Sequence, residues 1–168
     1  MLMQTYGPDW GRFDNHQDRL INFNFTGMHK EIGEYIIDST KERFRKGVAP
    51  DGSAWKPSRR AEETGGKTLM DSRVLYNSFT YRATASSVEV GTNVKYAAVH
   101  QGLDRSGQEV DEITIEPKKA KLLKFRIAGK WVSKNKVTII ARRYMGFNDE
   151  DTEEIGRIVD DRIEENLK

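Results

Sequence analysis

The sequence contains no cysteine, few prolines and no long hydrophobic run. None of the 168 residues is a cysteine, which excludes disulfide bonds, thiol catalysis, cysteine-ligated zinc and iron–sulfur centres within this chain. Hydrophobic residues make up 36% and charged residues 32%, and the mean hydropathy is −0.74. With aromatic residues at 10%, the composition predicts a folded domain with a small core. The absence of cysteine suits a reducing compartment.

The sequence also has no large net charge, and it has no segment typical of membrane insertion or export. The 28 basic and 26 acidic side chains nearly cancel, to +2, and this sum argues against a generic nucleic-acid binder. No segment approaches the roughly 20 apolar residues that a membrane helix needs. The first residues have neither the basic nor the apolar region of a secretory signal. We therefore expect a soluble chain, made in the cytoplasm, with no membrane partner.

Two regions differ in pattern along the chain. Residues 1–25 mix glycine, proline, asparagine and isolated aromatics without a sustained period, which predicts an N-terminal arm. Residues 26–168 are predicted to form a single α+β domain. Its expected architecture is a mostly antiparallel sheet flanked by an N-terminal and a C-terminal amphipathic helix.

Apolar residues at three- and four-residue spacing predict these two helices over 26–45 and 148–167. Gly47 is a suitable stop for the first helix. Asn148 is a suitable cap for the second, and the three acidic residues that follow it favour the positive end of the helix dipole.

Between these helices the patterns are short. A turn at 50–52 is predicted to deliver Trp55 to the surface beneath it. Residues 58–67 are predicted to be a polar loop, and a second helix is predicted to begin with Thr68 as its cap. The residues of that helix expected to face inward are Leu69, Val74, Leu75 and the pair Ser78 and Phe79.

Alternation of apolar and polar residues predicts the strands. A β-hairpin is expected over 79–90, and a helical turn closed by glycine over 96–102. Extended runs at 113–115, 123–132 and 137–140 complete the predicted sheet.

The sequence shows no pattern of an enzyme active site. Residues 65–68 read Gly-Gly-Lys-Thr, the end of a phosphate-binding loop, but Ala61 replaces the required earlier glycine and no strand precedes the loop. A flexible loop is the better interpretation, and a nucleotide-dependent enzyme ranks last. His16, His29 and His100 lie in separate elements without a partner at i+4. We predict no metal site, no cofactor and no catalytic residue.

Charge is unevenly distributed along the chain. Residues 117–143 contain ten basic and no acidic residues, whereas 149–168 contain nine acidic and three basic ones. The candidate contact residues, for another subunit or for DNA, are Lys118, Lys119, Lys121, Lys124, Arg126, Lys130, Arg142 and Arg143.

Three interpretations of this charge pattern stay open. The two blocks can be ordinary solvated faces. They also suit a head-to-tail interface in which the positive face of one subunit meets the negative face of the next, and such a contact makes a ring if its rotation closes. Alternatively, the basic segment faces DNA phosphates. Phe125 and Trp131 occupy strand positions that suit a core better than base stacking.

The order of motifs over roughly residues 26–167 resembles the phage virion morphogenesis family, the tail completion proteins of Mu-like and related tailed phages. The family usually has Arg-Pro where this chain has Arg143-Tyr144. The motifs that carry the resemblance are Arg43-Phe44, PDGSAWKP at 50–57, KTL at 67–69 with LYNSF at 75–79, VEVGT at 88–92, YAAVHQG at 96–102 and ARRYMGF at 141–147.

The resemblance implies a non-enzymatic structural protein of a tailed-phage virion, made in the host cytoplasm and located in the neck or tail. It implies a homo-oligomeric ring, a hexamer or a dodecamer, that is needed for head–tail joining as a tail terminator, stopper or completion protein. Neighbouring neck, connector or tail-tube rings are the expected partners, and DNA in the lumen is a candidate partner. The alternative is a DNA-binding accessory protein that uses residues 117–143.

Five residues within the motifs are assigned to the fold. A tryptophan anchored by a turn and a histidine at a helix end are usually structural. The residues assigned in this way are Arg43, Trp55, Tyr96, His100 and Gln101.

Overall fold

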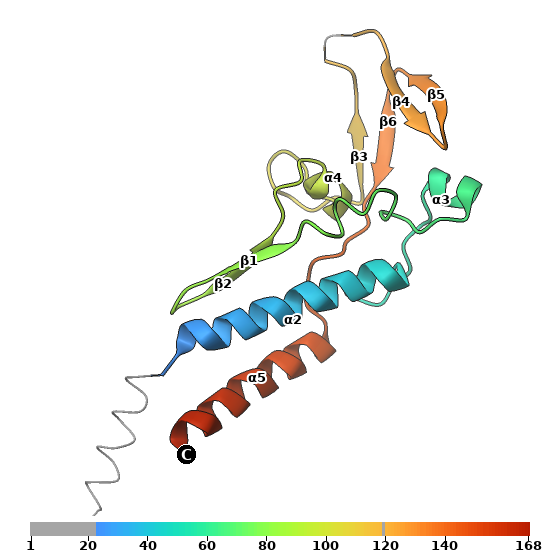
Figure 1. Ribbon diagram of the computed structural model, residues 1–168. Helices are drawn as coiled ribbons and strands as arrows, with labels where there is room; N and C mark the ends of the chain where they lie inside the picture. The colour runs from blue at the N-terminus through green and yellow to red at the C-terminus, as the bar shows by residue number, and fades with distance from the viewer. Residues whose placement is uncertain (1–22, 119) are drawn as a thin grey trace, which may run out of the picture.

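The computed structural model describes residues 23–118 and 120–168, so most of the predicted arm and Lys119 lie outside the described residues. The long helices α2 and α5 lie side by side, the hairpin β1–β2 runs along α2, and the other strands extend away from both helices (Figure 1). The α+β class is confirmed. The elements are α2 (Phe25–Lys46), α3 (Arg59–Thr64), β1 (Thr80–Ala83), β2 (Val88–Gly91), α4 (Ala97–Gln101), β3 (Glu112–Ile115), β4 (Leu123–Ile127), β5 (Lys130–Lys134), β6 (Val137–Ile140) and α5 (Asp149–Leu167).

Helix α2 confirms the first predicted helix and contacts β1, β2 and α5. The side chain of Asn24 caps it by accepting a hydrogen bond from the backbone N–H of Gly27 at 2.8 Å. The helix ends at Gly47, whose φ of 73° is left-handed. A Cβ atom on Gly33 would lie 2.7 Å from Cγ of Tyr81, so this glycine lets strand β1 pack directly against α2.

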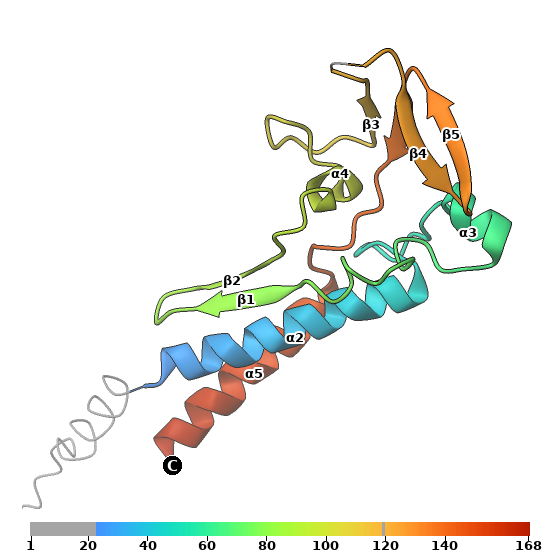
Figure 2. The same ribbon diagram turned by 45° about the horizontal axis from the view of Figure 1, so that its top comes forward.

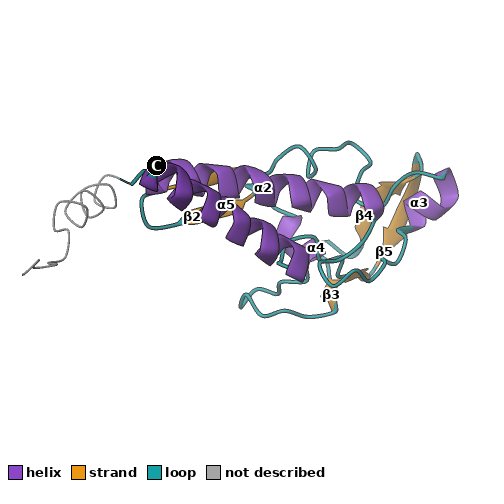
Figure 3. Ribbon diagram, turned by 90° about the horizontal axis from the view of Figure 1, so that it is seen from below, coloured by secondary structure: helices purple, strands orange, loops and turns teal. Residues whose placement is uncertain are grey.

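Helix α5 confirms the second predicted helix and packs along α2 (Figure 3). Asn148 and Asp151 form a reciprocal capping box, with N–H to side-chain oxygen distances of 2.8 and 3.0 Å. The buried Ile158 then meets Met28 and Ile32 of α2 in a small apolar cluster. One face of α5 is therefore covered, while most of its acidic residues stay exposed.

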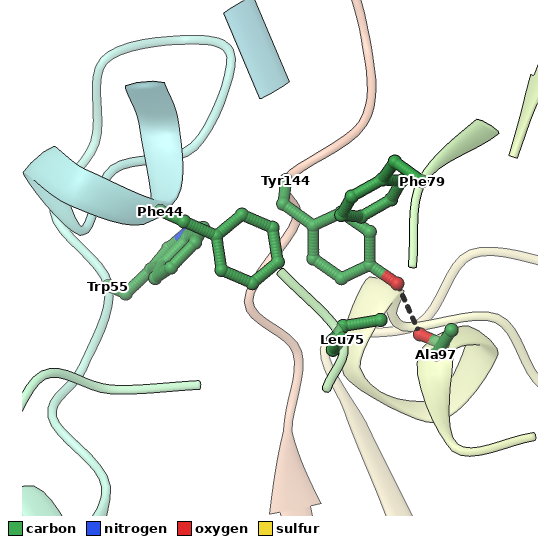
Figure 4. Packing of buried hydrophobic residues seen from close by; sticks show 6 residues of the cluster. All are labelled: Phe44, Trp55, Leu75, Phe79, Ala97 and Tyr144. Atoms are coloured by element: carbon green, nitrogen blue, oxygen red, sulfur yellow. Dashed lines mark hydrogen bonds between the residues drawn. The ribbon is translucent and has the colours of Figure 1, made fainter. Parts of the chain in front are cut away.

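A second apolar cluster gathers residues from distant parts of the chain around Phe44 (Figure 4). The ring of Phe44 lies 5.4 Å from that of Trp55, 5.7 Å from that of Phe79 and 5.0 Å from that of Tyr144, measured between centroids. Leu75 and Ala97 complete the buried set. Aromatic packing of this kind adds to the effect of burial, so the cluster joins α2, α4 and the segment before α5.

Two predictions between α2 and β1 are wrong. A short helix, α3, occupies the predicted polar loop, because Ser58 caps it by accepting a hydrogen bond from Ala61 at 3.2 Å. The helix predicted from Thr68 is absent from the described chain. Leu69 and Arg73 adopt left-handed φ angles of 60° and 58°, and these interrupt an α-helix.

The burial predicted for that segment holds only in part. Leu75 and Phe79 are buried as expected, and Leu69 is partly buried against the same cluster. Val74, expected to face inward, is 53% exposed. The turns therefore place two of the four apolar side chains fully in the core, although the backbone between them is irregular.

The strands form three separate two-stranded antiparallel sheets, β1–β2, β3–β6 and β4–β5 (Figure 2). Ile113 pairs with Ile139 in the second sheet, and Phe125 pairs with Val132 in the third. Because β6 returns to β3, the hairpin β4–β5 is an insertion between these two strands. Its turn contains Gly129 at a φ of 81°, which suits a tight hairpin.

Candidate functional site

Arg43 and Asp151 form a buried ion pair between α2 and α5. The guanidinium group also donates to the carbonyl oxygens of Gly146 at 2.7 Å and Tyr144 at 3.2 Å. The carboxylate accepts further hydrogen bonds from the hydroxyl groups of Ser39 and Tyr35. One pair of charged side chains therefore links both long helices to the segment that precedes α5.

The surroundings of this pair shift two pKa values. Burial alone would raise the pKa of Asp151, but hydrogen bonds from Ser39 and Asn148 and the charge of Arg43 outweigh it and lower that pKa. Burial, together with the nearby carboxylate of Asp151, raises the pKa of Tyr35 to about 12. The carboxylate is thus charged and the phenol neutral at physiological pH.

Gln101 and Trp55 also hold the segment that precedes α5. The side-chain oxygen of Gln101 accepts from the N–H groups of Tyr144 and Met145, both at 3.1 Å, and its amide donates to the carbonyl of Met145 at 2.8 Å. The indole N–H of Trp55 donates to the carbonyl of Arg143 at 2.9 Å. The structure therefore brings Arg43, Trp55 and Gln101 together around residues 143–146.

Tyr96 and His100 lie at the two ends of α4. The ring of His100 is half-buried, and burial first and the charge of Arg142 second lower its pKa. Tyr96 is 45% exposed and packs edge-on against His100, with the centroids 5.8 Å apart. Across residues 23–118 and 120–168, acidic and histidine side chains do not cluster in a way that could hold a metal ion.

Two of the eight candidate contact residues, Arg142 and Arg143, lie outside the hairpin β4–β5 and the loop that leads into it. Arg142 is buried, and its guanidinium donates to the carbonyl oxygens of Lys56 at 2.8 Å and Ile140 at 3.1 Å. Arg143 pairs with Asp111 at 3.2 Å. In the described chain both arginines serve contacts within the subunit.

The hairpin β4–β5 carries an exposed cationic face. Its register places Lys124 opposite Ser133 and Arg126 opposite Trp131, so these four side chains share one face. All four are exposed, and the guanidinium of Arg126 lies 5.2 Å from the ring centroid of Trp131. The expectation that Trp131 belongs to the core is wrong, because its side chain is 71% exposed.

The remaining candidate lysines surround this hairpin. Lys118 and Lys121 are exposed in the loop that leads into β4, and Lys130 is exposed at the start of β5. Lys119 lies outside the described residues. Five of the eight candidates, Lys118, Lys121, Lys124, Arg126 and Lys130, therefore belong to one basic projection.

The Gly-Gly-Lys-Thr segment is engaged by its own surroundings. The ammonium group of Lys67 donates to the carbonyl of Arg45 at 3.0 Å, and the hydroxyl of Thr68 accepts from the N–H of Ser58 at 3.0 Å. The lysine and threonine that a phosphate-binding loop would direct at a nucleotide thus stabilise the loop itself.

Sequence reasoning missed two residues that define these sites. The sequence predicts for Asp151 only a favourable interaction with the start of α5. The local pattern Asn-x-x-Asp indicates a capping box. It does not indicate that Asp151 pairs with Arg43 on α2. The exposure of Trp131 follows from the separation of β4–β5 from the other sheets, which strand alternation does not reveal.

Comparison with known proteins gives one match. The model of the phage virion morphogenesis family matches residues 12–164. Neither the curated proteins nor the solved structures contain a match. A helix long and apolar enough to cross a membrane does not occur among residues 23–118 and 120–168.

Proposed function

Because the chain belongs to the phage virion morphogenesis family, we propose that it is a tail completion, terminator or stopper protein that forms a ring where head and tail join. Membership in this family gives the chain a structural or assembly role in a phage virion. The match over residues 12–164 carries the proposal, since it spans nearly the whole chain.

The use of the buried polar groups supports a structural role. Arg43, Gln101 and Arg142 direct their donors at backbone carbonyl oxygens of the chain itself. Asp151 accepts from four partners within the same subunit. Groups engaged in this way hold the main chain in place, and a rigid subunit suits assembly into a defined oligomer.

The separation of charge supports a ring. The basic hairpin β4–β5 and the acidic helix α5 lie in different parts of the molecule (Figure 1). A contact between two different patches is heterologous, and it produces a ring when the rotation between subunits closes. Electrostatic complementarity also favours one register of association over others.

Removal of the gene from the phage tests this function. We expect cells infected with such a phage to accumulate DNA-filled heads and separate tails, because the joint between them is incomplete. Supplying the chain from a plasmid should restore joined particles. Intact, infectious virions that form without the chain would contradict the proposal.

A second candidate function is DNA binding by the hairpin β4–β5. The exposed Trp131 beside Arg126 is the observation that favours it, because exposed aromatic and cationic side chains together bind nucleic acid. This function predicts duplex binding that weakens steeply with salt. The slope of the logarithm of the binding constant against the logarithm of the salt concentration should fall in magnitude by about 1 for each phosphate-contacting cation removed. Binding that is undetectable at low salt would dismiss it.

A further inference from the structure

Helix α5 carries an acidic stripe that makes no ion pair with the described residues. Residues separated by three, four or seven positions share one helix face. Other acidic residues of α5 are already paired, Glu154 and Asp161 with Arg157 and Glu165 with Arg162. The exposed members of the stripe are Asp149, Glu153, Asp160 and Glu164, and the exposed Arg157, whose charge is balanced by its pairs with Glu154 and Asp161, borders them on the same side of the helix.

Gly156 lies at the centre of this stripe. A glycine inside a helix costs about 1 kcal/mol relative to alanine, so its presence calls for a physical reason. A Cβ atom at this position would meet no other atom within 4 Å, so packing within the subunit does not require glycine here. Glycine does allow another molecule to approach the helix backbone closely.

The hairpin β4–β5 presents the complementary surface. Lys124 and Arg126 make no ion pair with the residues that the structure describes, and Trp131 stands beside them on the same exposed face. This face combines cations with a large apolar ring. Tryptophan and arginine are the side chains most enriched at the energetically dominant centres of protein interfaces.

The two surfaces also match in spacing. Lys124 and Arg126 are two residues apart on a strand, which separates them by about 7 Å. Glu153 and Asp149, like Asp160 and Glu164, are four residues apart on a helix, which separates them by about 6 Å along its axis. A strand laid along the helix can therefore place successive cations opposite successive carboxylates, with the tryptophan ring over the glycine.

We infer that the exposed face of β4–β5 docks on the acidic stripe of α5 in a second copy of this chain. The inference rests on the proposed ring and names the contact that joins its subunits. Charge complementarity identifies the occupant: the hairpin is cationic, the stripe is anionic, and the two lie in different parts of one subunit, so a second copy supplies each with its partner.

Charge reversal tests this contact. The pair of substitutions Lys124→Glu and Arg126→Glu should weaken self-association by about 100-fold, since like charges then face each other. Adding Asp149→Lys and Glu153→Lys, two carboxylates whose spacing matches that of the cations, to the same chain should restore most of the lost association. The pair Lys30→Glu and Arg82→Glu, at exposed positions of α2 and β1, makes the same change in net charge, so it is the matched control and should leave association unchanged. Sedimentation equilibrium measures all three.

Substitution of Gly156 gives a second, independent measurement. Gly156→Gln should leave the melting temperature unchanged or higher, because glutamine is a better helix former. The same variant should weaken self-association by at least about 10-fold, since the new side chain occupies the docking surface. Weakened association without loss of folding supports the contact, and unchanged association contradicts it.

Cross-linking locates the contact directly, because the natural chain has no cysteine. A mixture of Ser133→Cys and Glu153→Cys chains should form a disulfide-linked heterodimer under mild oxidation. A mixture of Ser133→Cys and Ser86→Cys chains, with the second cysteine in the β1–β2 turn, should not.

The outcomes separate this inference from the proposed function. Oligomers that survive the charge reversal, or that are not restored by the compensating reversal, overturn the inference but leave the ring intact. A chain that stays monomeric and binds no tail overturns both. Loss of duplex DNA binding in the Lys124→Glu and Arg126→Glu variant, with self-association unchanged, assigns the face to DNA and also overturns the inference.

Discussion

Replacement of Asp151 by asparagine tests whether the buried ion pair holds α2 and α5 together. The side chains of Arg43 and Asp151 are 7% and 4% exposed, so the substitution leaves a buried guanidinium without its carboxylate. Breaking a buried pair in this way costs about 3–5 kcal/mol. Since Arg43 keeps its bonds to the carbonyls of Tyr144 and Gly146, we expect the lower end, about 3 kcal/mol.

Urea unfolding followed by circular dichroism measures this loss. The matched control is Asp160→Asn, an exposed acid on the same helix, which should change the free energy of unfolding by less than about 0.5 kcal/mol. Combining Arg43→Met with Asp151→Asn removes the unpaired charge, so the double variant should lose less than the sum of the two single ones. Equal stabilities of the Asp151 and Asp160 variants would refute the reasoning.

The same pair makes a pH prediction. The pKa of Asp151 is lowered from its ordinary value of 3.8, so the unfolded chain binds this proton more readily than the folded one. The stabilisation is therefore complete above about pH 4 and is lost as the pH falls through the folded pKa. The Asp151→Asn variant should lack this part of the acid dependence.

Three further substitutions or titrations test other parts of the fold. Gly33→Ala should destabilise the chain by about 1–3 kcal/mol in urea unfolding, because its Cβ would lie 2.7 Å from the ring of Tyr81. Tyr144→Phe should cost about 1–3 kcal/mol in the same assay, because the buried carbonyl of Ala97 loses its donor. Burial lowers the pKa of His100 from 6.5, so NMR titration should give a lower value, and stability should fall as the pH drops through it.

Local patterns were sufficient to predict the elements that local chemistry determines. The bounds of α2 and α5 follow from apolar spacing, a cap at Asn148 and a left-handed glycine at Gly47. Gly52 in the turn at 50–52 has a φ of 80°, and the side chain of Trp55 just after it is buried. The caps and turns that bound these elements involve residues within four positions of each other.

Long-range contacts explain where prediction from the sequence failed. The segment after Thr68 contains apolar residues at helical spacing, yet Leu75 and Phe79 pack on the Phe44 cluster with the backbone in turns. The pairing of Arg43 with Asp151 joins residues 108 positions apart, and a single sequence carries no signal for such a contact. Tertiary packing therefore determines both the backbone conformation after Thr68 and the pairing of Arg43 with Asp151.

Native mass spectrometry of the purified chain, alone and mixed with phage tails, tests the central claim most directly. The account predicts one closed oligomer of defined subunit number that attaches to tails. A chain that remains monomeric at assembly concentrations and binds neither heads nor tails would contradict it.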